Sequence, residues 1–300
     1  MRSARTLLLA SVPMWLALPL LGCSPEGYGA NPDTRGDGVG GGPFLPDAAA
    51  ADASDGGGKG YWACDPAFEL DRDRYEEFEG LEGETLGLAL AEFVTQDHDP
   101  RGYDPSREFL FEVLEVRDHG ELECVYTDAR TEPDGTNLPG GEFNTEHTWP
   151  RSRGAEGHPQ RSDLHHLFAV EIDANNRRAN HEFGHVACDE LSCNWYRDGS
   201  FLGPSSDDAR DPVFEVQPER RGDIARAILY FSVRYDEPVS PKEEAVLRAW
   251  NCDAPPSEYE RERNDAIEAF QGNRNPFIDR PDFVDHIERF DGHGADGADG

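Results

Sequence analysis

Residues 142–184 read EFNTEHTWPRSRGAEGHPQRSDLHHLFAVEIDANNRRANHEFG. This stretch mixes His, Asn, Asp, Glu and Arg more densely than a purely structural segment needs. His147 offers an imidazole, the side chain that titrates near neutral pH and can therefore act as a base. Glu146 and the pair Asn175–Asn176 offer hard oxygen ligands, which suit Mg²⁺ because that ion takes few protein ligands and keeps several waters.

Arginines accompany these groups along the same stretch, at positions 151, 153, 161, 177 and 178. Hydrolysis of a phosphodiester needs a base that activates water, a Lewis acid at the scissile phosphate and cations that offset the growing negative charge. The stretch holds a residue type for each of these tasks. Its composition therefore points to phosphodiester hydrolysis.

Three motifs in this stretch resemble those of a known family. Glu146-His147 with Pro150 and Ser152 looks like a Glu-His-x-x-Pro-x-Ser signature. Residues 163–167, DLHHL, look like an Asp-Leu-His-Asn-Leu element, with His166 where Asn is commoner. Residues 175–184 look like Asn-x-x-Arg-x-Asn-x-x-Phe-Gly. All three are features of the bacterial endonuclease I family, whose secreted and periplasmic nucleases carry a ββα-metal (His-Me finger) motif.

The likeness extends beyond the central stretch and covers roughly residues 81–285. A segment before it, ECVYT at 123–127, resembles a strand that precedes the family's site. Two later segments, RGDIARA at 221–227 and QGNRNPF at 271–277, resemble the family's late motifs. Several motifs in one order make a chance match improbable.

The resemblance implies a fold and an activity. The fold would be α+β, a mostly helical single domain around a ββα-metal motif. The activity would be metal-dependent endonucleolytic hydrolysis of DNA, RNA or both, with little sequence specificity and 5′-phosphate products. His147, on a β-hairpin, would be the general base. Arg178 would be a second catalytic residue, with a structural role as the alternative. Glu146 and Asn175 would hold Mg²⁺, with Ca²⁺ or Mn²⁺ as alternatives.

The resemblance also suggests supporting roles for other residues of the stretch. Positioning residues would be Asp163, His165, His166 and Asn180, and phosphate-binding candidates would be Arg151, Arg153 and Arg161. Asp163 has a simpler reading as the cap of the turn before Leu164. Neighbours on a regular strand face opposite ways, so Glu146 and His147 can share a site only if the backbone bends or twists there.

A rival reading rests on His181-Glu182-Phe183-Gly184-His185, a literal H-E-x-x-H. On a helix the two imidazoles would share a face and bind zinc, with the glutamate as the base of a metalloprotease. A milder version is a structural zinc held by His181, His185, Cys188 and Cys193. A disulfide between Cys188 and Cys193 competes with that zinc site, because an exported chain meets an oxidising compartment.

The N-terminal residues predict export. A basic start and an apolar run over residues 7–21 indicate a signal peptide at 1–22, and the LLGC end at 20–23 resembles a lipobox. Cys23 would then carry a lipid that anchors the chain to the cell envelope, with ordinary cleavage and secretion as the alternative. A Gly-, Asp- and Ala-rich stretch at 23–60 predicts a disordered tether, and 292–300 a disordered tail. The folded domain is expected at 61–291 and, in our prediction, is a monomer.

The net charge limits how this chain can bind nucleic acid. The formal net charge of −33 excludes binding of nucleic acid through the global field, so a nucleic-acid partner must be held locally by a few arginines and a metal ion.

If Cys23 is acylated, Cys64, Cys124 and Cys252 remain beside the Cys188–Cys193 pair. Two of these three can form a second disulfide, and the sequence leaves the choice open.

Hydrophobic patterns predict the elements around the central stretch. Residues 85–94, 223–233, 241–250 and 258–270 read as helices, the third with a proline in its first turn. Residues 121–126 read as a strand, and 108–115 fit either a helix or a strand. Helices on both sides of a short β region independently favour an α+β domain.

Overall fold

Eight α-helices and three small antiparallel sheets make up the part of the chain that the computed structural model describes, residues 64, 68–117, 119–133 and 142–292. This confirms the predicted α+β class. The predicted signal peptide, lipid-anchor cysteine and tether lie outside the described residues, as does the tail beyond Gly292. Within these described ranges, no helix is long and apolar enough to cross a bilayer.

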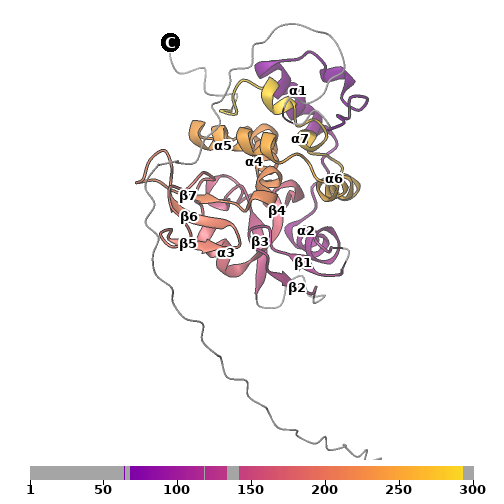
Figure 1. The fold of residues 1–300 in the computed structure, drawn as a ribbon. Helices are drawn as coiled ribbons and strands as arrows, with labels where there is room; N and C mark the ends of the chain where they lie inside the picture. The colour runs from indigo at the N-terminus through magenta and orange to yellow at the C-terminus, as the bar shows by residue number, and fades with distance from the viewer. Residues whose placement is uncertain (1–63, 65–67, 118, 134–141, 293–300) are drawn as a thin grey trace, which may run out of the picture. The chain divides into compact units, whose positions relative to one another are not determined.

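The helices gather on one side of the described domain and the sheets on the other (Figure 1). The helical half comprises α1 (Gly83–Gln96), α4 (Arg221–Tyr235), α5 (Pro241–Asp253), α6 (Glu258–Gln271), α7 (Pro276–Asp279) and α8 (Phe283–His286). The other half holds the strands and α3 (Ile172–Arg178), with α2 (Tyr103–Phe109) and its π-helical continuation Leu110–Leu114 at its edge.

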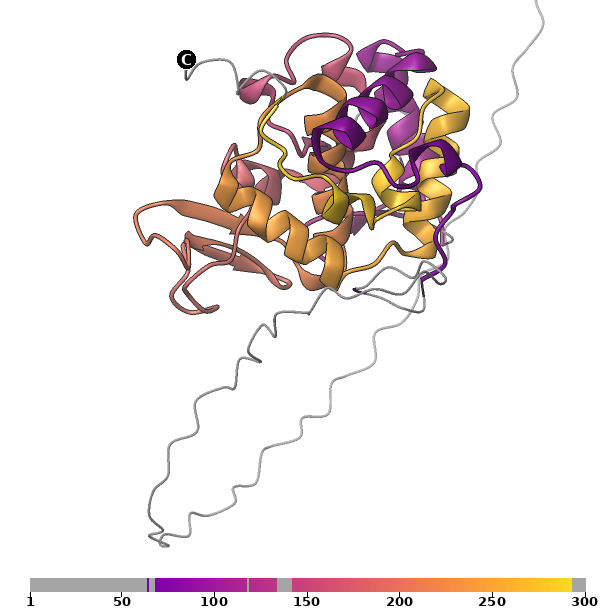
Figure 2. The same cartoon turned by 90° about the horizontal axis from the view of Figure 1, so that it is seen from above.

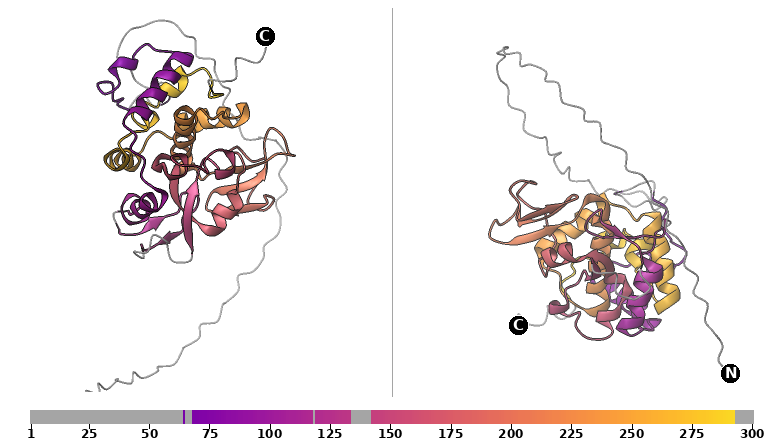
Figure 3. Two further views of the ribbon diagram at one scale, coloured as in Figure 1. Left: turned by 180° about the vertical axis from the view of Figure 1, so that it is seen from behind. Right: turned by 90° about the horizontal axis from the view of Figure 1, so that it is seen from below.

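The hairpin β3–β4 and α3 form the centre of the fold. β3 (Phe143–His147) pairs antiparallel with β4 (Leu167–Glu171), and α3 begins at the residue after β4. This is the ββα order that the resemblance implied. The first four residues of β4 are buried, as expected for an apolar strand that runs through a core. Seen from both sides, the hairpin lies between α2 and the sheet β5–β7 (Figures 1 and 3).

Two smaller sheets flank this centre. β5 (Trp195–Arg197), β6 (Ser200–Pro204) and β7 (Pro212–Glu215) form a meander that projects beside the helices (Figure 2). β1 (Leu122–Glu123) pairs with β2 (Arg130–Thr131). The predicted strand at 121–126 is thus shorter than expected. Its chain turns after β1, where Cys124 N bonds Ala129 O, and Val125 N then reaches Ala169 O of β4.

The predicted helices are present, and 108–115 is helical rather than extended. α4 is buried on all sides along most of its length, which is typical of a helix in the middle of a core. Gly222 near its start is required by packing, because a Cβ there would lie 2.1 Å from the carbonyl oxygen of Ala254. Ser240 and Ser257 cap α5 and α6 through backbone N–H groups three residues later, and Pro241 stands in the first turn of α5 as predicted.

The structure contains two disulfides among the described residues. Cys188–Cys193 is the short local bridge that the sequence favoured, and Cys64–Cys252 is the second pair. Cys124 is buried and free. The bridge Cys64–Cys252 spans 188 residues of sequence and ties the beginning of the described domain to α5.

Removing the long-range bridge is expected to weaken the fold. Because a disulfide that closes a long loop restricts the unfolded chain, a Cys64→Ser/Cys252→Ser variant should lose about 2–5 kcal/mol in urea unfolding. The matched control is Cys188→Ser/Cys193→Ser, which removes a disulfide with a sequence separation of 5. This variant should lose less free energy of unfolding. A larger loss in the control than in the long-range variant would contradict this expectation.

Candidate active site

An open cleft of about 630 Å³ lies where β3, the beginning of α2, the end of α3 and the loop after β3 meet. Residues from all four segments line it: Tyr103, Arg107, Asn144, Thr145, Glu146, His147, Pro150, Arg151, Ser152, Glu156, Asn175, Ala179 and Asn180. This volume is within the usual range for ligand sites. Five residues predicted from the central stretch, Glu146, His147, Arg151, Asn175 and Asn180, therefore meet in one place.

Glu146 and His147 both line this cleft although they are neighbours on β3. They stand opposite Phe168 and Leu167 of β4, at the end of the ladder. His147 is the last residue of the strand, so the strict alternation of a regular strand need not hold there. The backbone can therefore depart from regular strand geometry at His147, as a site shared by Glu146 and His147 requires.

His147 is held as a neutral imidazole. Its Nε2 lies 3.1 Å from the carbonyl oxygen of Arg161. A carbonyl can only accept, so Nε2 carries the hydrogen and Nδ1 keeps its lone pair. Burial, together with the neighbouring His166, lowers the pKa of His147 to about 2, although the bond to Arg161 opposes this shift. The ring packs between those of His166 and Tyr103, at centroid distances of 5.4 and 5.7 Å.

Glu146 is a buried carboxylate held through one oxygen. The hydroxyl of Tyr126 and the guanidinium Nη1 of Arg178 both donate to Oε1, each at 2.9 Å. Neither of these two bonds involves Oε2. Burial raises the pKa of Glu146, and the positive charge of Arg178 counters that rise. Oε1 thus anchors the side chain, and Oε2 is left as an acceptor.

Asn175 presents a second oxygen from α3. Its Nδ2 donates to Asn144 Oδ1 at 2.6 Å and to the carbonyl oxygen of Thr145 at 3.3 Å. Because that carbonyl can only accept, the amide nitrogen must face β3, and this leaves Oδ1 as the acceptor on the other side. The side chain therefore joins α3 to β3 and keeps an oxygen available.

The donor set of the cleft fits a hard divalent cation. Glu146 and Asn175 together contribute a carboxylate and an amide oxygen, and both line the same cleft. Mg²⁺ is commonly held by one or two such ligands with water completing its shell. Zinc sites need three or four His, Cys or acidic ligands. Within the described ranges, no three such side chains are grouped so that they could hold a metal.

Arg178 lies beneath the cleft and is not among the described residues that line it. Its side chain is 1% exposed. Besides Glu146, it donates to the main-chain oxygens of His147 and Thr148, and its guanidinium stacks 4.6 Å from the ring centroid of Phe183. The guanidinium is thus engaged by protein groups and holds the end of β3 together.

Asp163, His165 and His166 are buried behind the cleft. Asp163 accepts from the main-chain N–H of His165, which is the capping role considered for it, and also from two tyrosine hydroxyls. His165 Nε2 donates to Asn273 O at 3.1 Å. His166 Nε2 donates to Gln160 O at 2.7 Å.

The phosphate-binding candidates occupy different places. Arg151 and Asn180 line the cleft. Arg153 lies elsewhere and pairs with Glu243 of α5 at 3.4 Å. Arg161 reaches the cleft indirectly, since its guanidinium lies 4.3 Å from the ring centroid of Tyr103 and its carbonyl holds His147.

Tyr103, Arg107 and Asn144 line the cleft but were not predicted for the site. Tyr126, which holds Glu146, was also missed. A useful signal for Asn144 was its place two residues before Glu146, within the same motif-bearing strand. For α2 no local signal existed, because it lies far from the central stretch in sequence.

The structure contradicts the zinc alternative. α3 ends at Arg178, so the segment 181–185 is not helical and its two histidines do not share a helix face. His185 Nδ1 pairs with Glu215 Oε1 at 3.1 Å instead. The disulfide occupies both thiols of Cys188 and Cys193. Neither the protease-type site nor the structural zinc site is formed.

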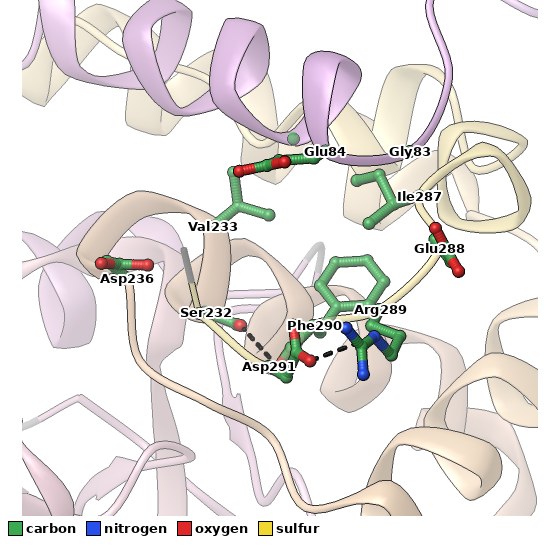
Figure 4. Close-up of a pocket in the computed structure, with 12 residues that line it drawn as sticks. Gly83, Glu84, Ser232, Val233, Asp236, Ile287, Glu288, Arg289, Phe290 and Asp291 are labelled. Atoms are coloured by element: carbon green, nitrogen blue, oxygen red, sulfur yellow. Dashed lines mark hydrogen bonds and ion pairs between the residues drawn. The ribbon is translucent and has the colours of Figure 1, made fainter. Parts of the chain in front are cut away.

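A second hollow lies between the start of α1, the end of α4 and residues 287–292 (Figure 4). Its rim carries four acidic residues, Glu84, Asp236, Glu288 and Asp291, and one arginine, Arg289, which pairs with Asp291 at 3.1 Å. An acidic rim repels phosphate. This hollow shares no residue with the cleft and holds none of the predicted site residues.

The sequence of this chain is similar to those of known nucleases. A sequence model of the family Endonuclease I matches residues 94–282. An extracellular ribonuclease of Bacillus subtilis (strain 168) is 30% identical over 237 residues, which cover 71% of this chain and 77% of that protein. An extracellular ribonuclease of Bacillus amyloliquefaciens is 28% identical over 234 residues, with the same two coverages. A periplasmic deoxyribonuclease of Aeromonas hydrophila is 30% identical over 131 residues, or 43% of this chain and 52% of that protein.

Proposed function

The chain belongs to the endonuclease I family, and from that premise we propose that it is an exported, Mg²⁺-dependent endonuclease that hydrolyses phosphodiester bonds of DNA and RNA. One observation carries the proposal. The neutral imidazole of His147, the carboxylate of Glu146 and the amide oxygen of Asn175 line the same open cleft. That combination supplies a base and two hard oxygen ligands side by side.

His147 acts as the general base. Nδ1 accepts the proton of the attacking water, while the Nε2–H bond to Arg161 O keeps the ring oriented throughout. Burial makes the imidazole a weak base before substrate arrives, because it lowers the pKa. A phosphodiester entering the cleft brings negative charge beside the ring, and such a charge favours the imidazolium that forms when Nδ1 accepts the proton.

Glu146 and Asn175 hold the metal ion. When bound, Mg²⁺ supplies Lewis-acid stabilisation of the charge that develops on the phosphate and on the leaving oxygen. Glu146 contributes Oε2, since Oε1 accepts from Tyr126 and Arg178. Asn175 contributes Oδ1, since its Nδ2 donates to Asn144 and Thr145.

Arg178 is a positioning residue in this proposal rather than one that touches the substrate. Its burial and its three acceptors on β3 and the following residue support that assignment. Arg151 is the phosphate-binding arginine, because it is the cleft-lining one of the three candidates. Arginine suits this role through its fork of N–H donors.

The groups that line the cleft suggest how selective the enzyme is for nucleic-acid sequence. The groups that line the cleft suit phosphate and sugar, and such contacts position a nucleic acid without reading its bases. Little sequence specificity is therefore expected. The family resemblance further implies 5′-phosphates on the products. The names of the relatives include both ribonucleases and a deoxyribonuclease, which supports activity on both polymers.

The decisive experiment incubates plasmid DNA and a structured RNA with the protein in Mg²⁺ or EDTA. Cleavage is expected in Mg²⁺ and is expected to stop in EDTA. Asn175→Ala should need a higher Mg²⁺ concentration for half-maximal rate, by about 10-fold or more, because one of two ligands is lost. Glu146→Ala is a poorer probe, since it strands Arg178 as a buried unpaired charge.

Asn176→Ala is the matched control, because it is the neighbouring asparagine on α3 and does not line the cleft. Its Mg²⁺ requirement should equal that of the unmodified protein. Cleavage that persists in EDTA would refute metal dependence. An unchanged Mg²⁺ requirement in Asn175→Ala would remove that residue from the metal site.

Export is part of the proposal as well. The relatives named above are extracellular or periplasmic proteins, which supports export of this chain. The signal peptide at 1–22 and the lipid anchor at Cys23 stay predictions from sequence, as does the monomeric state. Two disulfides within the described domain are consistent with an oxidising compartment.

A further inference from the structure

A carboxylate of the protein itself covers the phosphate-binding arginine of the cleft. Glu156 accepts from Arg151 through both oxygens, with Nε–Oε2 at 3.1 Å and Nη2–Oε1 at 2.7 Å. Both side chains line the cleft. This is the two-pronged geometry with which arginine also binds a phosphate.

The loop after β3 holds Glu156 in this place. Gly154 adopts a φ of +125°, which favours glycine, and lets the chain turn back after Arg153. Ala155 is then fully buried, and the carbonyl of Gly157 accepts from the main-chain N–H of Arg161 at 2.7 Å. The residues on both sides of Glu156 are thus fixed, while its own side chain is 67% exposed.

The charges around the cleft make Glu156 distinctive. Two acidic residues are among the described residues that line it, Glu146 and Glu156. Glu146 is buried and paired with Arg178, whereas Glu156 faces solvent at the point where a polyanion would approach. In a chain of net charge −33, an arginine that is kept from phosphate by an adjacent carboxylate matters more than it would in a basic protein.

We propose that Glu156 occupies the phosphate-binding side of Arg151 in the free enzyme, so that a nucleic-acid phosphate must displace it, and that this exchange sets the affinity for substrate. The inference rests on the proposed function, since it assigns a competitor to that site. Exposed ion pairs are weak, so a phosphate can replace the carboxylate without disturbing the fold.

The exchange is tested by binding in a variant that does not cleave. His147→Ala and His147→Ala/Glu156→Gln are titrated against fluorescein-labelled duplex DNA and a labelled RNA hairpin in Mg²⁺, with fluorescence anisotropy as the readout. Glu156→Gln should lower the Kd about 2- to 5-fold, the range that exposed ion pairs span. The slope of log Kd against log salt should stay the same, because Arg151 neutralises the same phosphate in both complexes.

Asp208→Asn is the matched control. Asp208 also accepts from one arginine through both oxygens, Arg210, at 3.1 and 3.0 Å, and its loss also removes one negative charge. It does not line the cleft. Its Kd and salt dependence should match those of His147→Ala alone.

The same comparison is made in an Arg151→Gln background, where Glu156→Gln should no longer change the Kd. The proposal is overturned if Glu156→Gln binds no more tightly than Asp208→Asn, or if its effect is undiminished without Arg151. The second result would mean that binding tightened because one negative charge was removed near the cleft, and not because Arg151 was released. Because binding is measured without cleavage, these outcomes are independent of whether the unmodified protein cuts nucleic acid.

Discussion

His147→Ala is expected to lower the rate of cleavage by about 10²–10⁴-fold, the usual contribution of a general base. The imidazole is neutral, its Nε2–H is engaged by Arg161 O and its Nδ1 is the free acceptor in the cleft. Alanine removes the acceptor and leaves the carbonyl of Arg161 facing the space that the ring filled. The rate constant on plasmid DNA in saturating Mg²⁺ measures the effect.

The fold should survive this change. His147 is the last residue of β3, and its main-chain bonds do not depend on the side chain. Circular dichroism and urea unfolding would establish that the variant is native. His185→Ala is the matched control, because His185 is 42% exposed and lies outside the cleft. Full activity in a folded His147→Ala protein would remove the residue from the mechanism, and an equal loss of activity in His185→Ala would show that the effect is not specific to the cleft.

Arg178→Met is expected to cost about 3–5 kcal/mol in the free energy of unfolding, the usual penalty for breaking a buried ion pair by removing one partner. Methionine keeps much of the volume but donates no hydrogen bonds. The carboxylate of Glu146 would then be buried with Tyr126 as its remaining donor, and the carbonyls of His147 and Thr148 would lose theirs. Urea unfolding of the isolated variants gives the comparison.

Arg177→Met on the same helix is the control for this effect. Arg177 is about half exposed and pairs with Asp173 at 3.4 Å, so its loss should change stability by less than about 1 kcal/mol. If the two variants are equally stable, the buried network does not hold the end of β3. Where Arg178→Met still folds, its Mg²⁺ requirement should rise, because Glu146 is no longer oriented; a purely structural arginine would leave that requirement unchanged.

The element pattern was largely predictable from local sequence. Apolar residues at helical spacing indicated α1, α4, α5 and α6, and the proline in the first turn of α5 indicated where it begins. The strand at 121–126 was predicted too long. Its residues are apolar enough for a strand, but pairing ends where Cys124 turns toward Ala129, and no local pattern indicates that turn.

The site was predictable where its residues share one segment. Glu146 and His147 on β3 and Asn175 on α3 line the cleft together, and all three come from the stretch 142–184. Their catalytic and metal-binding roles stay proposals. Tyr103 and Arg107 were missed because α2 reaches the cleft through packing against distant parts of the chain.

The sequence by itself determined the family, the α+β class and the residue types that meet in the cleft, because these follow from local motifs and hydrophobic spacing. Tertiary structure decided what each charged side chain does. Arg178 is buried beneath the site, Arg151 is paired with Glu156, and His181 and His185 lie beyond the end of a helix. The reason is physical: the role of an ionisable group depends on its solvation and on the charges beside it, and packing between distant segments sets both.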